Sequence, residues 1–128
     1  MTITPAMART INVSIHLTDL ELEEDARDQQ AHYLVRELQE MGIDSACRVA
    51  DPNPPAGNKA LGGFIVGLLT AEVSLSNVQL VLKFFGDRLA NKTIELEVEA
   101  DGKRLRVSAS SQTELEKAIA AAQEFVAA

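Results

Sequence analysis

The chain has 128 residues, enough for one domain, with 46% hydrophobic and 24% charged residues, as in an ordinary globular protein. Its formal net charge of −7 argues against nucleic acid as a partner, because phosphate binding relies on clustered lysine and arginine. The single cysteine, Cys47, excludes an internal disulfide and is expected to fill a small space in the core. We expect one cytoplasmic domain over residues 1–128, with residues 1–10 as a flexible N-terminal segment.

The first strand is predicted at residues 11–17, where apolar and polar residues alternate strictly. Alternation places every second side chain on the same face of a strand. His16 falls on the polar face, so we expect this histidine to be exposed or to lie in a second layer around a site. The buried face should consist of Ile11, Val13, Ile15 and Leu17.

A helix is predicted after a run of six acidic residues within residues 19–28. Acidic residues in a first helical turn complement the helix dipole and keep the surface solvated. The run is alternatively a docking face for a basic partner. Gly42 is expected to end the helix, since glycine readily adopts a left-handed conformation. The apolar stripe should contain Ala26, Tyr33, Leu34, Leu38 and Met41.

Residues 44–50 are a weaker strand candidate, and the segment DPNPPAGNK that follows is predicted to be the longest loop, since it holds three prolines and a glycine. From residue 60 to residue 89 the apolar spacing predicts helix, with a break between two helices near Ser74 and Ser76. Residues 61–82 contain Glu72 as their only charge. That length raises the alternative of a membrane span, but polar residues and glycines within it favour a buried core helix.

The segment TIELEVEADGKRLRVSAS predicts a hairpin with a two-residue type I′ turn at Asp101 and Gly102. Ser111 and Glu114 then have the spacing of a capping box that begins a final helix. The fold class is therefore α+β, with about four strands in one sheet, including the 93–110 hairpin, and helices packed on one face. Strand order stays open. The expected cross-strand pairs are Glu99 with Arg104, Val98 with Leu105, Glu97 with Arg106 and Leu96 with Val107.

The proline-rich loop is the one candidate binding site. Backbone amides at a helix start, permissive glycines and a nearby lysine can hold an anion or a partner's carboxylate. The alternative is structural: prolines stiffen a crossover and Gly57 makes a turn. The partner- or anion-binding candidates are Pro55, Gly57, Asn58 and Lys59.

Catalytic chemistry has little support in the residues. His16 and His32 lack the spacing of a metal site, and nothing in the sequence brings Cys47 next to a histidine. No nucleophile elbow, phosphate-binding lysine motif or dinucleotide fingerprint is present. Three glutamates, Glu95, Glu97 and Glu99, share one strand face, but two arginines on the next strand are expected to pair with them. We therefore expect no catalytic residue, no metal ligand and no cofactor.

The layout resembles the effector-associated constant component family, first type, over most of the chain from Ile11. These are small α+β proteins encoded beside proteases, NTPases and other effectors of bacterial conflict systems. The family usually carries glycine after the lysine, where this sequence has Ala60 and then Gly62-Gly63. The resemblance rests on the proline-rich loop with Gly57 and Lys59, the segment Leu61–Leu69, the hairpin ending in Leu105-Arg106-Val107 and the helix after Ser111.

The resemblance implies a noncatalytic accessory or adaptor protein that acts with an effector partner, such as a protease or an NTPase, and it carries over no active-site residue. The alternative function is a small anion or nucleotide sensor that uses the 55–63 loop. A homodimer is a further possibility, because the hairpin edge can pair with a second copy.

Overall fold

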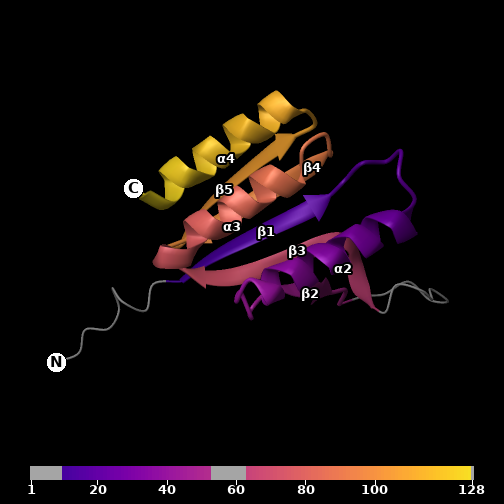
Figure 1. Ribbon diagram of the computed structural model, residues 1–128, viewed down its shortest axis with the longest axis horizontal. Helices are drawn as coiled ribbons and strands as arrows, with labels where there is room; N and C mark the ends of the chain where they lie inside the picture. The colour runs from indigo at the N-terminus through magenta and orange to yellow at the C-terminus, as the bar shows by residue number, and fades with distance from the viewer. Residues whose placement is uncertain (1–9, 53–62, 128) are drawn as a thin grey trace.

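A five-stranded antiparallel sheet with three helices on one face makes up the protein, as the computed structural model shows for residues 10–52 and 63–127 (Figure 1). The α+β prediction is confirmed, although the sheet has five strands and not about four. Their order is β2-β3-β1-β4-β5. The strands are β1 (Thr10–Leu17), β2 (Cys47–Ala50), β3 (Phe64–Ser74), β4 (Ile94–Ala100) and β5 (Lys103–Ala109), and the helices are α2 (Glu24–Glu40), α3 (Leu75–Arg88) and α4 (Gln112–Ala127).

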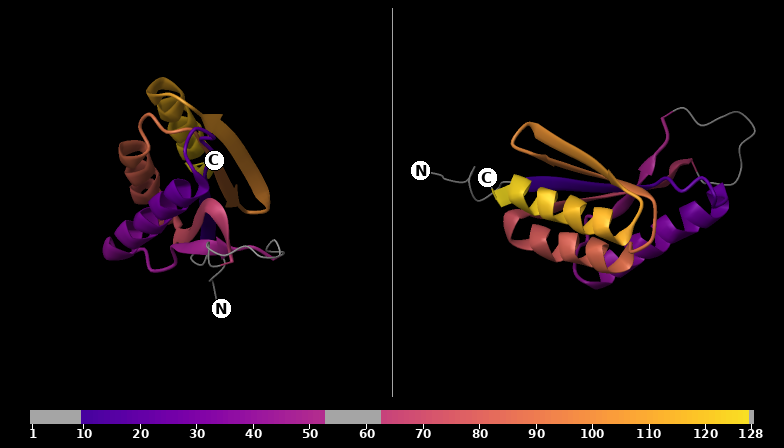
Figure 2. Two further views of the ribbon diagram at one scale, coloured as in Figure 1. Left: turned by 90° about the vertical axis from the view of Figure 1, so that its right-hand side faces the viewer. Right: turned by 90° about the horizontal axis from the view of Figure 1, so that it is seen from above.

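The core lies between the sheet and its helices, and Figure 2 shows the helices on one side of the sheet. Strand β1 is central, and its alternation is confirmed because Ile11, Val13 and Ile15 are fully buried. Each helix presents its own apolar stripe to this face. One side of the sheet is thereby covered, and the polar side chains of β1 stand on the other side.

Gly42 terminates helix α2 as predicted, but the buried face of the helix differs from the predicted apolar stripe. Gly42 has φ of +98°, and the Gly42 and Ile43 amides donate to the Gln39 and Leu38 carbonyls in a Schellman arrangement. Tyr33 and Met41, predicted to be buried, are 53% and 39% exposed. Neighbouring helical residues point about 100° apart, so a face centred on Leu34 and Leu38 turns Tyr33 outward. The buried residues are Ala31, Leu34, Val35 and Leu38.

The prediction of helix from residue 60 onward is wrong for residues 64–74, which form strand β3. This strand pairs with both β1 and β2. Ser74 is the N-cap of α3, so it separates a strand from a helix and not two helices. In the part of the chain that the structure describes, no helix is both long and apolar enough to cross a membrane.

The hairpin is confirmed in every predicted cross-strand pair. Asp101 and Gly102 have φ of 55° and 77°, as a type I′ turn requires. The capping box at the start of α4 is confirmed only in part. The Ser111 hydroxyl accepts a hydrogen bond from the Glu114 amide, but the Glu114 carboxylate accepts from the amide and hydroxyl of Ser110.

Candidate functional site

The binding residues predicted from the sequence, Pro55, Gly57, Asn58 and Lys59, lie outside the described residues. The structure does describe the two flanks of that loop. The Asp51 amide donates a hydrogen bond to the Gly63 carbonyl at 2.6 Å, which brings the flanks together at the end of β2 and the start of β3. The structure therefore describes the point where β2 ends and β3 begins, on either side of the predicted site.

A bulge in β3 beside this point leaves backbone carbonyls without strand partners. Register with β2 shifts between Arg48 and Ala50, because Arg48 pairs with Leu69 whereas Ala50 pairs with Phe64. The Arg48 guanidinium donates from Nε to the Leu68 carbonyl and from Nη2 to the Ile65 carbonyl, each at 3.2 Å. Arg48 therefore satisfies the carbonyls that the bulge frees.

The charge of Arg48 is neutralised within the fold. Its side chain is only 8% exposed, forms an ion pair with Asp28 of α2, and lies 5.1 Å over the Phe64 ring. Burying a charge is tolerated when it is paired and hydrogen-bonded. The Arg48 side chain therefore links β2, β3 and α2. Because these contacts use its charge, it is not available to bind a free anion.

The histidines and the cysteine do not meet. His16 Nε2 lies 3.1 Å from the Val66 carbonyl, and His32 is exposed on α2. Cys47 is exposed, which corrects the expectation of a core residue, since it lies on the short edge strand β2. Cys47 opposes Thr70 whereas His16 opposes Leu68, so they occupy different rows of the sheet. Among the described residues, no cluster of His, Cys, Asp and Glu is suited to hold a metal ion.

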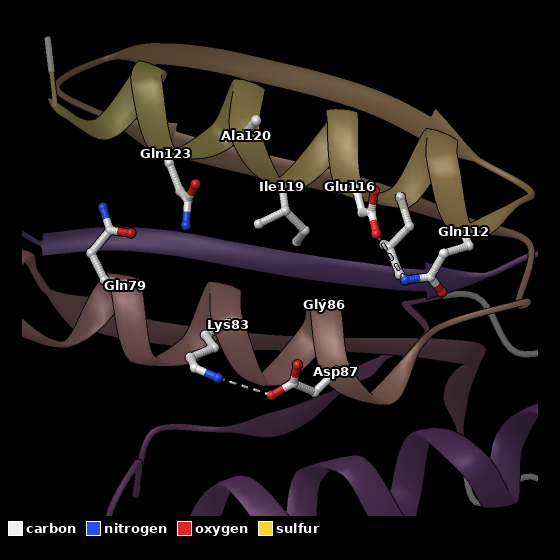
Figure 3. A pocket seen from close by; sticks show the side chains of 10 residues that line it. Gln79, Lys83, Gly86, Asp87, Gln112, Glu116, Ile119, Ala120 and Gln123 are labelled. Carbon is white, nitrogen blue, oxygen red and sulfur yellow. Dashed lines mark hydrogen bonds and ion pairs between the residues drawn. The ribbon is translucent and has the colours of Figure 1, made fainter.

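A groove of about 480 Å³ lies between α3 and α4 (Figure 3). The two helices run in opposite directions along it. The helices pack closely at Gly86, where an added Cβ would lie 3.6 Å from Cγ1 of Ile119, at an ordinary van der Waals distance. Leu115 and Ile119 of α4 line the groove and are almost fully buried, so its floor is apolar.

The rim of the groove is polar. Lys83 pairs with Asp87 at 3.4 Å along α3, and the Gln112 amide donates to Glu116 at 3.1 Å along α4. Because both interactions stay within one helix, neither closes the groove.

Two further amide side chains line the opening. Figure 3 shows the Gln79 and Gln123 side chains reaching toward the space between α3 and α4. Across the ranges 10–52 and 63–127, neither side chain has a hydrogen-bond partner. Each amide can both donate and accept, so the rim offers hydrogen bonds to either kind of group on a partner.

Sequence reasoning missed this groove. Its residues belong to two helices that the hairpin separates in the chain, and the polar positions of each helix lie beside an ordinary apolar stripe. The one available signal was glycine within a helix, at Gly86, because glycine lowers helix stability and is often retained for close packing.

The glutamate and arginine ladder of the hairpin forms as predicted, with one addition. Arg106 pairs with Glu97 at 3.1 Å, and Arg104 reaches both Glu99 at 3.4 Å and Glu97 at 2.8 Å. Glu95 opposes Ser108 and has no arginine opposite it. Two of the three glutamates are thus explained by ion pairs.

Comparison of the chain with protein-family models, curated proteins and solved structures found no match.

Proposed function

We propose that this chain is a noncatalytic accessory or adaptor protein that binds an effector partner through the α3–α4 groove. The observation that carries the proposal is an apolar floor together with rim amides that have no hydrogen-bond partner among residues 10–52 and 63–127. Leu115 and Ile119 supply the floor, and Gln79 and Gln123 supply the amides. Interfaces commonly pair an apolar centre with a polar rim.

The occupant that best fits is an amphipathic helix of the partner. A helix presents apolar residues at intervals of three and four, and such a stripe docks into a hydrophobic groove. The groove follows two antiparallel helices, so a third helix laid along it would extend the helical layer. Apolar side chains of the partner would cover Ile119, and its polar flanks would meet Gln79 and Gln123.

The biological setting rests on the resemblance to the effector-associated constant component family. That resemblance favours an effector of a bacterial conflict system, such as a protease or an NTPase, as the partner. It also favours a cytoplasmic protein that supplies binding while the partner supplies catalysis. The groove supports the binding part of this proposal, and its lining residues do not include the binding residues predicted from the sequence.

A matched pair of arginine substitutions tests the groove. Proteins that copurify with the tagged chain from its native cells are identified, and the effector among them is purified for calorimetry. Ala120→Arg places a long charged side chain in the groove at an exposed position. Ala127→Arg adds the same side chain at an exposed position outside it. We expect Ala120→Arg to bind the effector at least tenfold more weakly than the unsubstituted chain, a loss of about 1.4 kcal/mol in binding free energy. Ala127→Arg should not show this loss.

Equal affinity of the two variants for the effector would remove the groove from the proposal. Turnover of a substrate by the isolated chain, in the absence of any effector, would overturn its noncatalytic role. Melting curves of both variants, matched to the unsubstituted chain, show that any lost binding does not come from unfolding.

A further inference from the structure

The side of the sheet opposite the helices carries a small hollow of about 160 Å³. The pairing of the strands brings its lining residues together. His16 of β1 opposes both Leu68 of β3 and Glu95 of β4, and Ser14 of β1 opposes Glu97 of β4. The three helices pack on the other side of these strands (Figure 2). The hollow is lined by Ser14, His16, Leu68, Glu95, Glu97 and Arg106.

Hydrogen bonds within the fold leave this hollow with mainly acceptor groups. A carbonyl only accepts, so the contact between His16 Nε2 and the Val66 carbonyl makes Nε2 the donor. In the tautomer that carries its proton on Nε2, Nδ1 is an acceptor. Ser14 donates its hydroxyl proton to Thr70 Oγ1 at 3.0 Å and retains only accepting lone pairs.

The one cation in the hollow is already engaged, because Arg106 pairs with Glu97. Glu95 remains a carboxylate without an ion-pair or hydrogen-bond partner among residues 10–52 and 63–127.

The surrounding sheet face is acidic as well. The cross-strand register places four glutamates, Glu72, Glu95, Glu97 and Glu99, on this face with two arginines, Arg104 and Arg106. The net charge of these six side chains is therefore −2, which has the same sign as the formal net charge of −7 of the whole chain. Local charge and overall charge both favour a cationic partner, which long-range attraction would also steer toward the protein.

We propose that this hollow receives an arginine side chain of a protein partner. Guanidinium has five donors and no acceptor, which matches a hollow that offers mainly acceptors, and its planar fork matches the geometry of a carboxylate such as Glu95. The hollow admits one side chain, since pockets for drug-sized ligands occupy roughly 300–1,000 Å³. The hollow lies on the side of the sheet opposite the α3–α4 groove. The proposed arginine contact is therefore independent of the proposed binding in the groove.

Nuclear magnetic resonance titration of the full chain with the blocked peptide Gly-Gly-Arg-Gly-Gly tests the assignment. The same peptide with citrulline, a neutral isostere, and with lysine serve as comparisons. We expect saturable shifts centred on the amides of Ser14, His16, Leu68 and Glu95 with the arginine peptide, and at least fivefold weaker binding of the other two. Free L-arginine should bind no more tightly than the arginine peptide.

Two charge-matched variants complete the test. Glu95→Gln should weaken the arginine peptide at least fivefold, while Glu124→Gln, which removes the same charge from an exposed position on α4, should leave its affinity unchanged. Melting curves check that both variants remain folded. Equal losses in the two variants, equal binding of the lysine peptide, or tighter binding of free L-arginine would each overturn the proposal.

Discussion

Arg48 of β2 forms an ion pair with Asp28 of α2, and only 8% and 16% of the two side chains are exposed. Asp28 also accepts a hydrogen bond from the Gly67 amide at 3.4 Å. The pair therefore links the short strand β2 to helix α2 and to the bulge in β3.

Loss of either partner should destabilise the fold strongly. Replacing Asp28 with leucine or Arg48 with methionine leaves the other charge buried without its partner. We expect each single variant to lose about 3 kcal/mol of unfolding free energy, as is typical when a buried pair is broken. Urea denaturation followed by circular dichroism measures the loss.

The double variant is the control for this prediction. With both charges replaced by apolar side chains, the double variant should lose less stability than the sum of the two single variants. Simple additivity would show that the two side chains act separately and that their ion pair contributes nothing to the fold.

Gly67 is expected to be the least replaceable of the positive-φ glycines. Its φ is +71°, and a Cβ at this position would lie 2.8 Å from the Leu17 carbonyl oxygen. Gly102 has φ of +77° but nothing within 4 Å of its Cβ position. Gly102→Ala should therefore lower the free energy of unfolding by about 1–2 kcal/mol, because of its backbone conformation alone. Gly67→Ala should lower it further, because its Cβ would also clash with the Leu17 carbonyl oxygen. Equal unfolding free energies of the two variants would contradict this.

Cys47 should react in the native state, because it is exposed on an edge strand. A colourimetric disulfide reagent should titrate one thiol per chain without denaturant, at a rate close to that in urea. A reaction that requires unfolding would mean that this side chain is covered in solution. Cys47→Ser should leave the unfolding free energy within about 0.5 kcal/mol, as for surface substitutions generally.

Glu114 should make the start of α4 sensitive to acid. Hydrogen bonds from the Ser110 amide and hydroxyl hold the pKa of the Glu114 carboxyl below its ordinary value. Because the folded pKa is the lower one, the stabilisation is complete above the ordinary pKa of about 4.3 and is lost as the pH falls through the folded pKa. Glu114→Gln should remove part of the acid dependence of unfolding below that pH, whereas Glu124→Gln on the same helix should not. Identical acid dependence in the two variants would exclude this role.

The hairpin illustrates how much local sequence can determine. Asp101 and Gly102 favour the left-handed conformations of a type I′ turn, and the turn fixes which residues face each other. Alternation then places Val98 opposite Leu105 on one face and Glu97 opposite Arg106 on the other. Turn chemistry, alternation and charge all agree here, so the register was predictable without any tertiary contact.

Strand β3 shows the opposite case. Residues 69–73 do alternate between buried and half-buried or exposed positions, but the bulge at residues 65–68 interrupts the period before them. With its alternation broken, an apolar run of this kind also fits the spacing of a helix. The deciding factor is pairing with β1 and β2, whose residues lie far away in the chain.

Local signals were therefore enough to predict four elements: the alternating strand β1, the hairpin, the glycine that ends α2 and the helix α4 that follows Ser111. Tertiary structure decided the features that depend on distant residues meeting. These are the strand identity of residues 64–74, the order of the sheet, the Arg48–Asp28 pair, the α3–α4 groove and the hollow beside His16 and Glu95. Each of them brings together side chains that no local periodicity links, because pairing and packing operate between elements whose relative placement only the folded chain defines.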